Sequence, residues 1–153
     1  MANRVSSDLV RKAIDQIDRE RMVKMTMDLT NIPSPTGYEG EMARAVNDLL
    51  RGAGFDSVLQ PIGDERYNAV GRLQGKGGGK SLMFNGHLDT SFGPEQAHRG
   101  IGYKCEGTLV DNEWIYGMGS FNMKSAMATY ITASDAIRKA GIKLGADVVI
   151  AGV

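Results

Sequence analysis

The order of elements in the second half of the chain constrains the fold most. Residues 81–86 contain the apolar run Leu82-Met83-Phe84 and predict a strand. Met123 to Ala140 predicts a helix, whose charge-free middle (126–134) should lie against a sheet. The β-rich run 146–153 predicts a further strand. Because such strand–helix–strand units are nearly always right-handed crossovers between parallel strands, the sequence predicts an α/β fold with a mixed, partly parallel sheet flanked by helices.

Two helices are predicted ahead of this unit. Leu9, Ala13 and Ile17 recur at helical spacing behind a cap at residues 6–8, and predict a helix that runs to about Leu29 and buries one apolar stripe. The prolines at 33 and 35 end it. Thr36 and Glu39 then have the spacing of a capping box and open a second helix. Its inward side chains are Met42, Val46, Leu49 and Leu50, and it stops at Gly52 and Gly54.

The remaining segments predict less regular structure. Strands are expected at 55–62 and 68–73, joined to the strand at 81–86 through a glycine-rich turn. Residues 91–112 are predicted to be irregular, with a short strand at most at 113–116. No internal repeat and no domain boundary is evident, so residues 1–153 are predicted to form part of one domain.

Composition excludes several classes of function. Eighteen basic residues balance eighteen acidic ones, whereas binders of nucleic acid or anionic membranes usually carry a basic excess. The single cysteine, Cys105, has no partner for a disulfide and no Cys or His nearby for a metal site, so we expect a small, half-buried side chain. The N-terminus lacks the apolar run of a signal peptide, and no stretch approaches the roughly 20 apolar residues of a spanning helix. The sequence therefore predicts a soluble, cytoplasmic protein.

Three common enzyme signatures are absent. Gly79-Lys80-Ser81 imitates the end of a phosphate-binding loop, but Gln74 replaces the first glycine and a strand follows where a helix is required. Gly117-Met118-Gly119 lacks the third glycine of a dinucleotide fingerprint. No Gly-x-Ser-x-Gly elbow is present, and only two histidines could serve as a base. Phosphate-loop, dinucleotide and serine-hydrolase chemistry are therefore poorly supported.

Chemistry is concentrated just after the predicted strand at 81–86. In Asn85-Gly86-His87-Leu88-Asp89-Thr90, a histidine and a carboxylate stand two residues apart on extended backbone and so point the same way. The carboxylate of Asp89 can accept a hydrogen bond from one nitrogen of His87 while the other nitrogen binds a metal. The alternative is a purely structural His–Asp pair at a strand end.

A second stretch further along the chain complements the first. It runs Tyr116-Gly117-Met118-Gly119-Ser120-Phe121-Asn122-Met123-Lys124-Ser125-Ala126-Met127-Ala128. In this order the two stretches resemble the signature regions of the zinc aminoacylase, acetylornithine deacetylase, succinyl-diaminopimelate desuccinylase and dipeptidase family of metallopeptidases. Ile32-Pro33-Ser34-Pro35 and Gly40-Glu41 fit the same family. The resemblance implies a phosphorylase/hydrolase-like metallopeptidase catalytic domain, of which 1–153 is the N-terminal portion, with the rest and a dimerisation domain outside this chain.

The resemblance also implies roles for single residues. His87 becomes a metal ligand, and Asp89 the catalytic-site carboxylate that clamps it. Asn122 stands where the family usually has an aspartate that bridges two ions and precedes a cis peptide bond. The alternative for Asn122 is that it caps the following helix. His98 matches no ligand, and Lys124 and Ser125 are given only a role in starting the helix.

The function implied is hydrolysis of an amide bond, non-peptide or dipeptide-like, of a small molecule by a metal-activated water. Zinc is the expected ion, with manganese or cobalt as alternatives. Asn122 brings no negative charge, so one ion is expected to bind well and a second poorly. The protein is expected to form a homo-oligomer, and to bind neither nucleic acid nor membrane.

The chain stops at the end of the predicted strand 146–153. There the family continues into a Glu-Glu pair that supplies the general base, so this chain alone is expected to be incomplete and inactive. It is also expected to self-associate through its last strand, taken as an unprotected sheet edge. Two other functions are left open. One is hydrolysis of an aryl C–N bond by a one-metal family member, and the other is a non-catalytic piece with a vestigial site.

Overall fold

A four-stranded mixed sheet forms one layer of the protein. The computed structural model describes residues 6–95 and 105–153. The strands lie in the order β1-β2-β6-β3, with bounds β1 Asp56–Gly63, β2 Arg66–Leu73, β3 Leu82–Gly86 and β6 Val148–Gly152. β2 pairs antiparallel with β1 and β6, whereas β3 and β6 are parallel. The predicted parallel pair and the mixed sheet are both confirmed.

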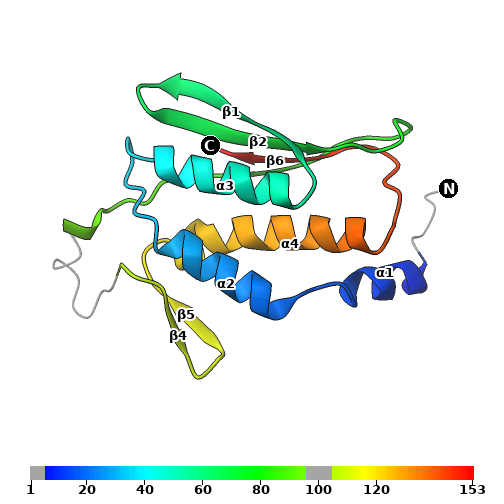
Figure 1. Ribbon diagram of the computed structural model, residues 1–153, viewed down its shortest axis with the longest axis horizontal. Coiled ribbons are helices and arrows are strands. Elements are labelled where there is room, and N and C mark those ends of the chain that lie inside the picture. The colour runs from blue at the N-terminus through cyan, green and yellow to red at the C-terminus, as the bar shows by residue number, and fades with distance from the viewer. Residues whose placement is uncertain (1–5, 96–104) are drawn as a thin grey trace.

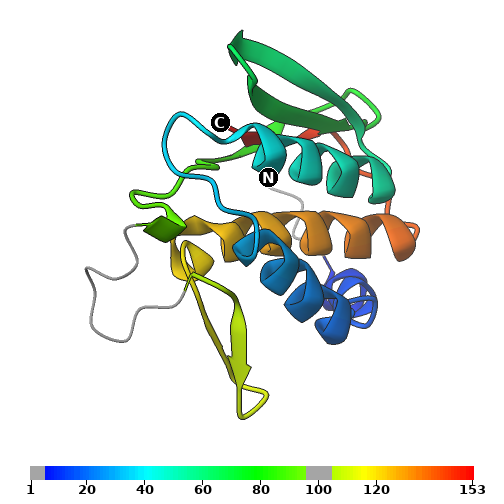
Figure 2. The same ribbon diagram turned by 60° about the vertical axis from the view of Figure 1, so that its left-hand side comes forward.

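The helices form a second layer. α3 (Gly40–Gly52) packs against β1 and β2, and α4 (Ser125–Lys139) packs against β3 and β6. α2 (Arg19–Thr30) lies on α4, further from the sheet, as both ribbon views show (Figure 1, Figure 2). The core between the layers is lined by fully buried apolar side chains. They include Leu29, Met42, Val46, Leu50, Leu88, Met127, Ile131 and Ile150.

The first predicted helix is in fact two helices. α1 (Ser7–Ile14) begins at the expected cap, because the Ser6 side chain accepts from the Leu9 N–H. The backbone is extended at Asp18, whose carboxylate accepts from the Arg21 N–H at 2.9 Å and starts α2. An aspartate N-cap of this kind competes with helix continuation. The predicted buried stripe is wrong for α1, because no residue of this helix is buried.

The predicted capping box of α3 is also wrong. Neither Thr36 nor Glu39 caps the helix; Thr36 donates to Asp89, and Glu39 accepts from Arg66 and from the Gly37 N–H. Glu39 is buried, which alone would raise its pKa, but the bonds from Arg66 and Gly37 outweigh burial and lower it. Tertiary partners have therefore displaced the local capping interaction.

A small hairpin projects from the main body. β4 (Thr108–Val110) and β5 (Trp114–Tyr116) pair antiparallel below the helices (Figure 2). β5 matches the predicted short strand, whereas β4 lies in a segment that was predicted to be irregular. A single wide turn, η2 (Ser120–Lys124), connects the hairpin to α4. α4 therefore starts slightly later than predicted.

The position of β6 overturns the expectation of an exposed last strand. β6 lies between β2 and β3 and is hydrogen-bonded on both sides. The edges of the main sheet are β1 and β3. Sequence periodicity identifies strands but not their order in a sheet, because that order depends on pairing between distant segments. No helix among the described residues is long and apolar enough to cross a membrane.

Candidate metal centre

The candidate site begins where β3 ends. The β3–β6 pairing continues past β3, since Val153 N–H donates to Gly86 and Leu88 N–H donates to Val153. Leu88 is fully buried and points into the core. Alternation along extended backbone turns the residues on either side, His87 and Asp89, away from the core. This is the arrangement predicted for the pair.

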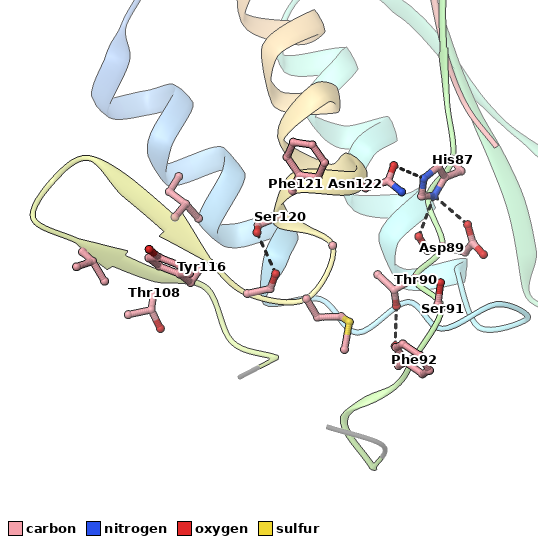
Figure 3. Close-up of a pocket in the computed structure, with 15 residues that line it drawn as sticks. His87, Asp89, Thr90, Ser91, Phe92, Thr108, Tyr116, Ser120, Phe121 and Asn122 are labelled. Atoms are coloured by element: carbon pink, nitrogen blue, oxygen red, sulfur yellow. Dashed lines mark hydrogen bonds and ion pairs between the residues drawn. The ribbon is translucent and has the colours of Figure 1, made fainter. Parts of the chain in front are cut away.

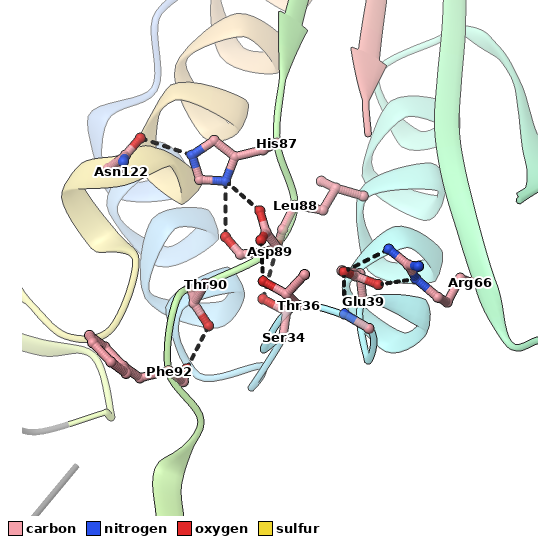
Figure 4. A network of polar contacts seen from close by, with 11 residues as sticks. Ser34, Thr36, Glu39, Arg66, His87, Leu88, Asp89, Thr90, Phe92 and Asn122 are labelled. Carbon is pink, nitrogen blue, oxygen red and sulfur yellow. Dashed lines mark hydrogen bonds and ion pairs between the residues drawn. The ribbon is translucent and has the colours of Figure 1, made fainter. Parts of the chain in front are cut away.

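The imidazole of His87 is held on both sides. Nδ1 lies 3.0 Å from Asp89 Oδ1 and 2.9 Å from the Asp89 main-chain oxygen. Nε2 lies 2.9 Å from Asn122 Oδ1, on the η2 turn (Figure 4). The structure therefore brings together all three residues selected from the sequence, from two segments far apart in the chain.

Both ring nitrogens of His87 face oxygen atoms that accept hydrogen bonds. A neutral imidazole has only one N–H, so it can satisfy only one side. The pKa of His87 is raised, first by the bond to Asn122 and then by Asp89, against the opposing effect of burial. The unsatisfied contact between a ring nitrogen and an oxygen is relieved if His87 takes up a second proton or if the Asn122 amide rotates. A cation bound beside Nε2 would relieve it as well. With Nδ1 clamped by Asp89, the Nε2 nitrogen of His87 and the amide oxygen of Asn122 remain as donors for a cation, and imidazole nitrogen is a usual zinc ligand.

These donors open onto a cavity of about 740 Å³. It is lined by the polar side chains of His87, Asp89 and Asn122 and by aromatic side chains that include Phe92, Tyr116 and Phe121 (Figure 3). The size is in the range of small-molecule sites. Among the described residues no group of three or more His, Cys, Asp or Glu side chains could hold an ion. The described residues therefore offer two ligands, His87 and Asn122, to a single metal ion.

The alternative helix-capping role of Asn122 is wrong. The Asn122 side chain faces His87, and neither η2 nor α4 has a side-chain cap. The peptide bond between Asn122 and Met123 is cis, as the resemblance implied. Cys105 is half-buried as expected, and burial raises its pKa. His98 lies outside the described residues.

Sequence reasoning missed the segment 34–36, which holds the site through hydrogen bonds. Residues 34–36 run beside 88–90: Thr90 N–H donates to Ser34 O at 2.7 Å, and Ser34 Oγ donates to Leu88 O at 2.8 Å. The side chain of Lys124 is buried and donates to Ile32 O at 2.5 Å, and burial lowers its pKa to about 8. Both halves of the site are thus tied to the chain between α2 and α3. No local pattern predicts these bonds, because each joins residues distant in sequence.

The chain is similar in sequence to known enzymes. A succinyl-diaminopimelate desuccinylase from Dinoroseobacter shibae is 33% identical over 112 residues, which are 73% of this chain and 29% of that protein. In sequence the chain is related to the succinyl-diaminopimelate desuccinylases. No protein-family model matches it.

Solved structures show the same fold at lower identity. Human carnosine dipeptidase 1 superimposes on 95% of this chain and 34% of its own length, with a TM-score of 0.75 and 17% identity. A Bacillus subtilis protein described as a dinuclear metal binding peptidase from the M20 family covers 87% of this chain and 34% of its own, with a TM-score of 0.58 and 14% identity. The chain thus spans about a third of the length of each of these three proteins.

Proposed function

We propose that the protein is a metal-dependent hydrolase that cleaves an amide bond of a small molecule. The observation that carries this proposal is the 2.9 Å approach of His87 Nε2 to Asn122 Oδ1 at the cavity, with Nδ1 held by Asp89. The relationship to a desuccinylase supports amide hydrolysis as the reaction. Homo-oligomerisation, a cytoplasmic location and the absence of nucleic-acid and membrane partners stay predictions.

Each residue would have a separate task. His87 and Asn122 would hold the ion, and Asp89 would fix the tautomer and orientation of the imidazole. A bound zinc ion would supply a water of lowered pKa and polarise the substrate carbonyl. Asp89 is the one carboxylate among the described cavity residues, and both its oxygens are engaged by His87 and Thr36. The base that takes the proton of the water would therefore come from another part of the protein.

Asn122 would also limit the number of ions. An amide oxygen binds one cation and brings no charge, whereas a carboxylate can bridge two cations and offset their repulsion. We expect one tightly bound divalent ion per active site in the natural protein. Asn122→Asp should raise the number towards two.

The test uses the protein as its gene encodes it. Metal per chain is measured after dialysis, together with hydrolysis of N-succinyl and N-acetyl amino acids and of dipeptides. His87→Ala should lose bound zinc and activity, and His98→Ala is the matched control that should keep both. Two tightly bound ions in the unaltered protein, or equal metal content in the two alanine variants, would contradict the proposal.

A further inference from the structure

We propose that Thr36 is a positioning residue of the metal centre, acting through Asp89 on His87. Its Oγ1 donates to Asp89 Oδ2 at 2.6 Å, while Asp89 Oδ1 lies 3.0 Å from His87 Nδ1 (Figure 4). The two carboxylate oxygens are thus engaged by different partners. A carboxylate held at both oxygens cannot rotate, so the His87 ring is held in one orientation. This inference rests on the proposed metal-dependent function.

The backbone around Thr36 is fixed independently of its hydroxyl. Thr36 N–H donates to Thr90 O at 3.2 Å, and Pro35 forms a parallel bridge with Thr90. Ser34 makes the two further bonds to the 88–90 segment described above. Removing the hydroxyl alone should therefore leave the segment in place. A variant without the Thr36 hydroxyl therefore tests how Asp89 is oriented, while the backbone of this segment keeps its position.

The nearby guanidinium of Arg66 does not duplicate this role. Its Nε and Nη2 donate to the two carboxylate oxygens of Glu39, at 2.8 and 3.2 Å. Among the described residues, Thr36 is the side chain that donates a hydrogen bond to Asp89 Oδ2. Thr36 is also exposed, so this hydroxyl should matter little to folding. Its effect should appear mainly in the metal ligand that Asp89 orients.

The experiment compares three variants of the protein as its gene encodes it. Thr36→Val keeps the shape and removes the donor, and Thr36→Ser keeps the donor. Thr26→Val is the matched control: it makes the same change in α2, where the hydroxyl donates to Met22 O at 2.9 Å. The probe is Co²⁺, whose dissociation constant and visible absorption spectrum report on the ligand set. The midpoint of urea unfolding is measured in parallel. Thr36→Ala is the second donor-less variant if valine fits poorly.

Thr36→Val should weaken Co²⁺ binding by about 10-fold, within the 10–100-fold typical of outer-shell partners, and should alter the spectrum. Thr36→Ser should restore both. Thr26→Val should keep both the dissociation constant and the spectrum, whatever its effect on the unfolding midpoint. Wild-type affinity in both donor-less variants, or a serine variant as weak as the valine one, would overturn this inference. If wild type and His87→Ala bind Co²⁺ equally, the proposed function itself fails.

Discussion

Replacing Asp135 by asparagine should lower the free energy of unfolding by roughly 1.5–3 kcal/mol at neutral pH, because one buried carboxylate joins α2 to α4. The Asp135 side chain is 3% exposed. Arg138 donates to Oδ1 at 2.6 Å, Lys139 lies 3.1 Å from Oδ2, and Arg21 of α2 also donates to Oδ2. Burial would raise the pKa of Asp135, but these three bonds outweigh burial and lower it.

The magnitude follows from the exposure of the partners. A hydrogen bond to a charged group contributes about 1.5–3 kcal/mol, but the three cationic side chains are 37–43% exposed and regain water when the carboxylate is lost. Discounting each bond to about a third gives the figure above. Asp28→Asn is the matched control: its pair with Lys24 is exposed on both sides, so its effect should stay within about 0.5 kcal/mol.

The pH dependence provides the second readout. A carboxyl whose pKa is lowered on folding stabilises the protein above its unfolded pKa, and this stabilisation disappears as pH falls through the folded pKa. The gap between wild type and Asp135→Asn should be constant from about pH 5 to 7. It should narrow below the ordinary value of 3.8. Urea unfolding followed by circular dichroism at several pH values measures both quantities. An Asp135→Asn variant that lowered the free energy of unfolding no more than Asp28→Asn does would refute the reasoning. So would a difference in this free energy between wild type and Asp135→Asn that increased at acid pH.

Two other substitutions test close packing. Gly75→Ala should lower the free energy of unfolding by about 1–3 kcal/mol, because its Cβ would stand 2.3 Å from the Ala146 backbone; Gly78→Ala, 3.9 Å from the nearest atom, should be tolerated in the same denaturation assay. Leu88→Ala should cost about 2–5 kcal/mol through the cavity it leaves, and it should also weaken Zn²⁺ binding, because Leu88 lies between His87 and Asp89 and is fully buried. Unchanged stability in Gly75→Ala or Leu88→Ala would contradict the packing described.

Sequence patterns predicted the parts of the fold that depend on local order. The apolar strands β3 and β6, and the charge-free helix between them, have signals contained within each segment. The parallel pairing of the two strands is expected because a helix between them returns the chain to the end of the sheet where β3 began. The break at Asp18 was missed because the apolar spacing continues on both sides of it. The capping roles expected of Thr36 and Glu39 failed because each side chain found a stronger partner far along the chain.

The residues of the site likewise fall into those that could be predicted from the sequence and those that could not. His87 and Asp89 were selected from their spacing, and Asn122 from the resemblance alone, and the structure places their side chains in contact. The hydroxyl of Thr36 and the buried amine of Lys124 were not selected. Each acts on a main-chain or side-chain oxygen of another segment. Such bonds depend on which segments the fold brings together, and a single sequence contains no periodicity that marks them.

The interior position of β6 has a consequence for synthesis on the ribosome. β1 and β2 are neighbours in sequence and can pair as soon as both have emerged. β3 emerges next, but its partner in the sheet is β6, with Leu82 paired to Val148. Until residues 148–152 arrive, one edge of β2 and the whole of β3 are unpaired, and the apolar side of α4 has no complete sheet to cover. During this interval, set by the spacing of β3 and β6 along the chain, the nascent protein presents unpaired strands to aggregation and to binding by chaperones.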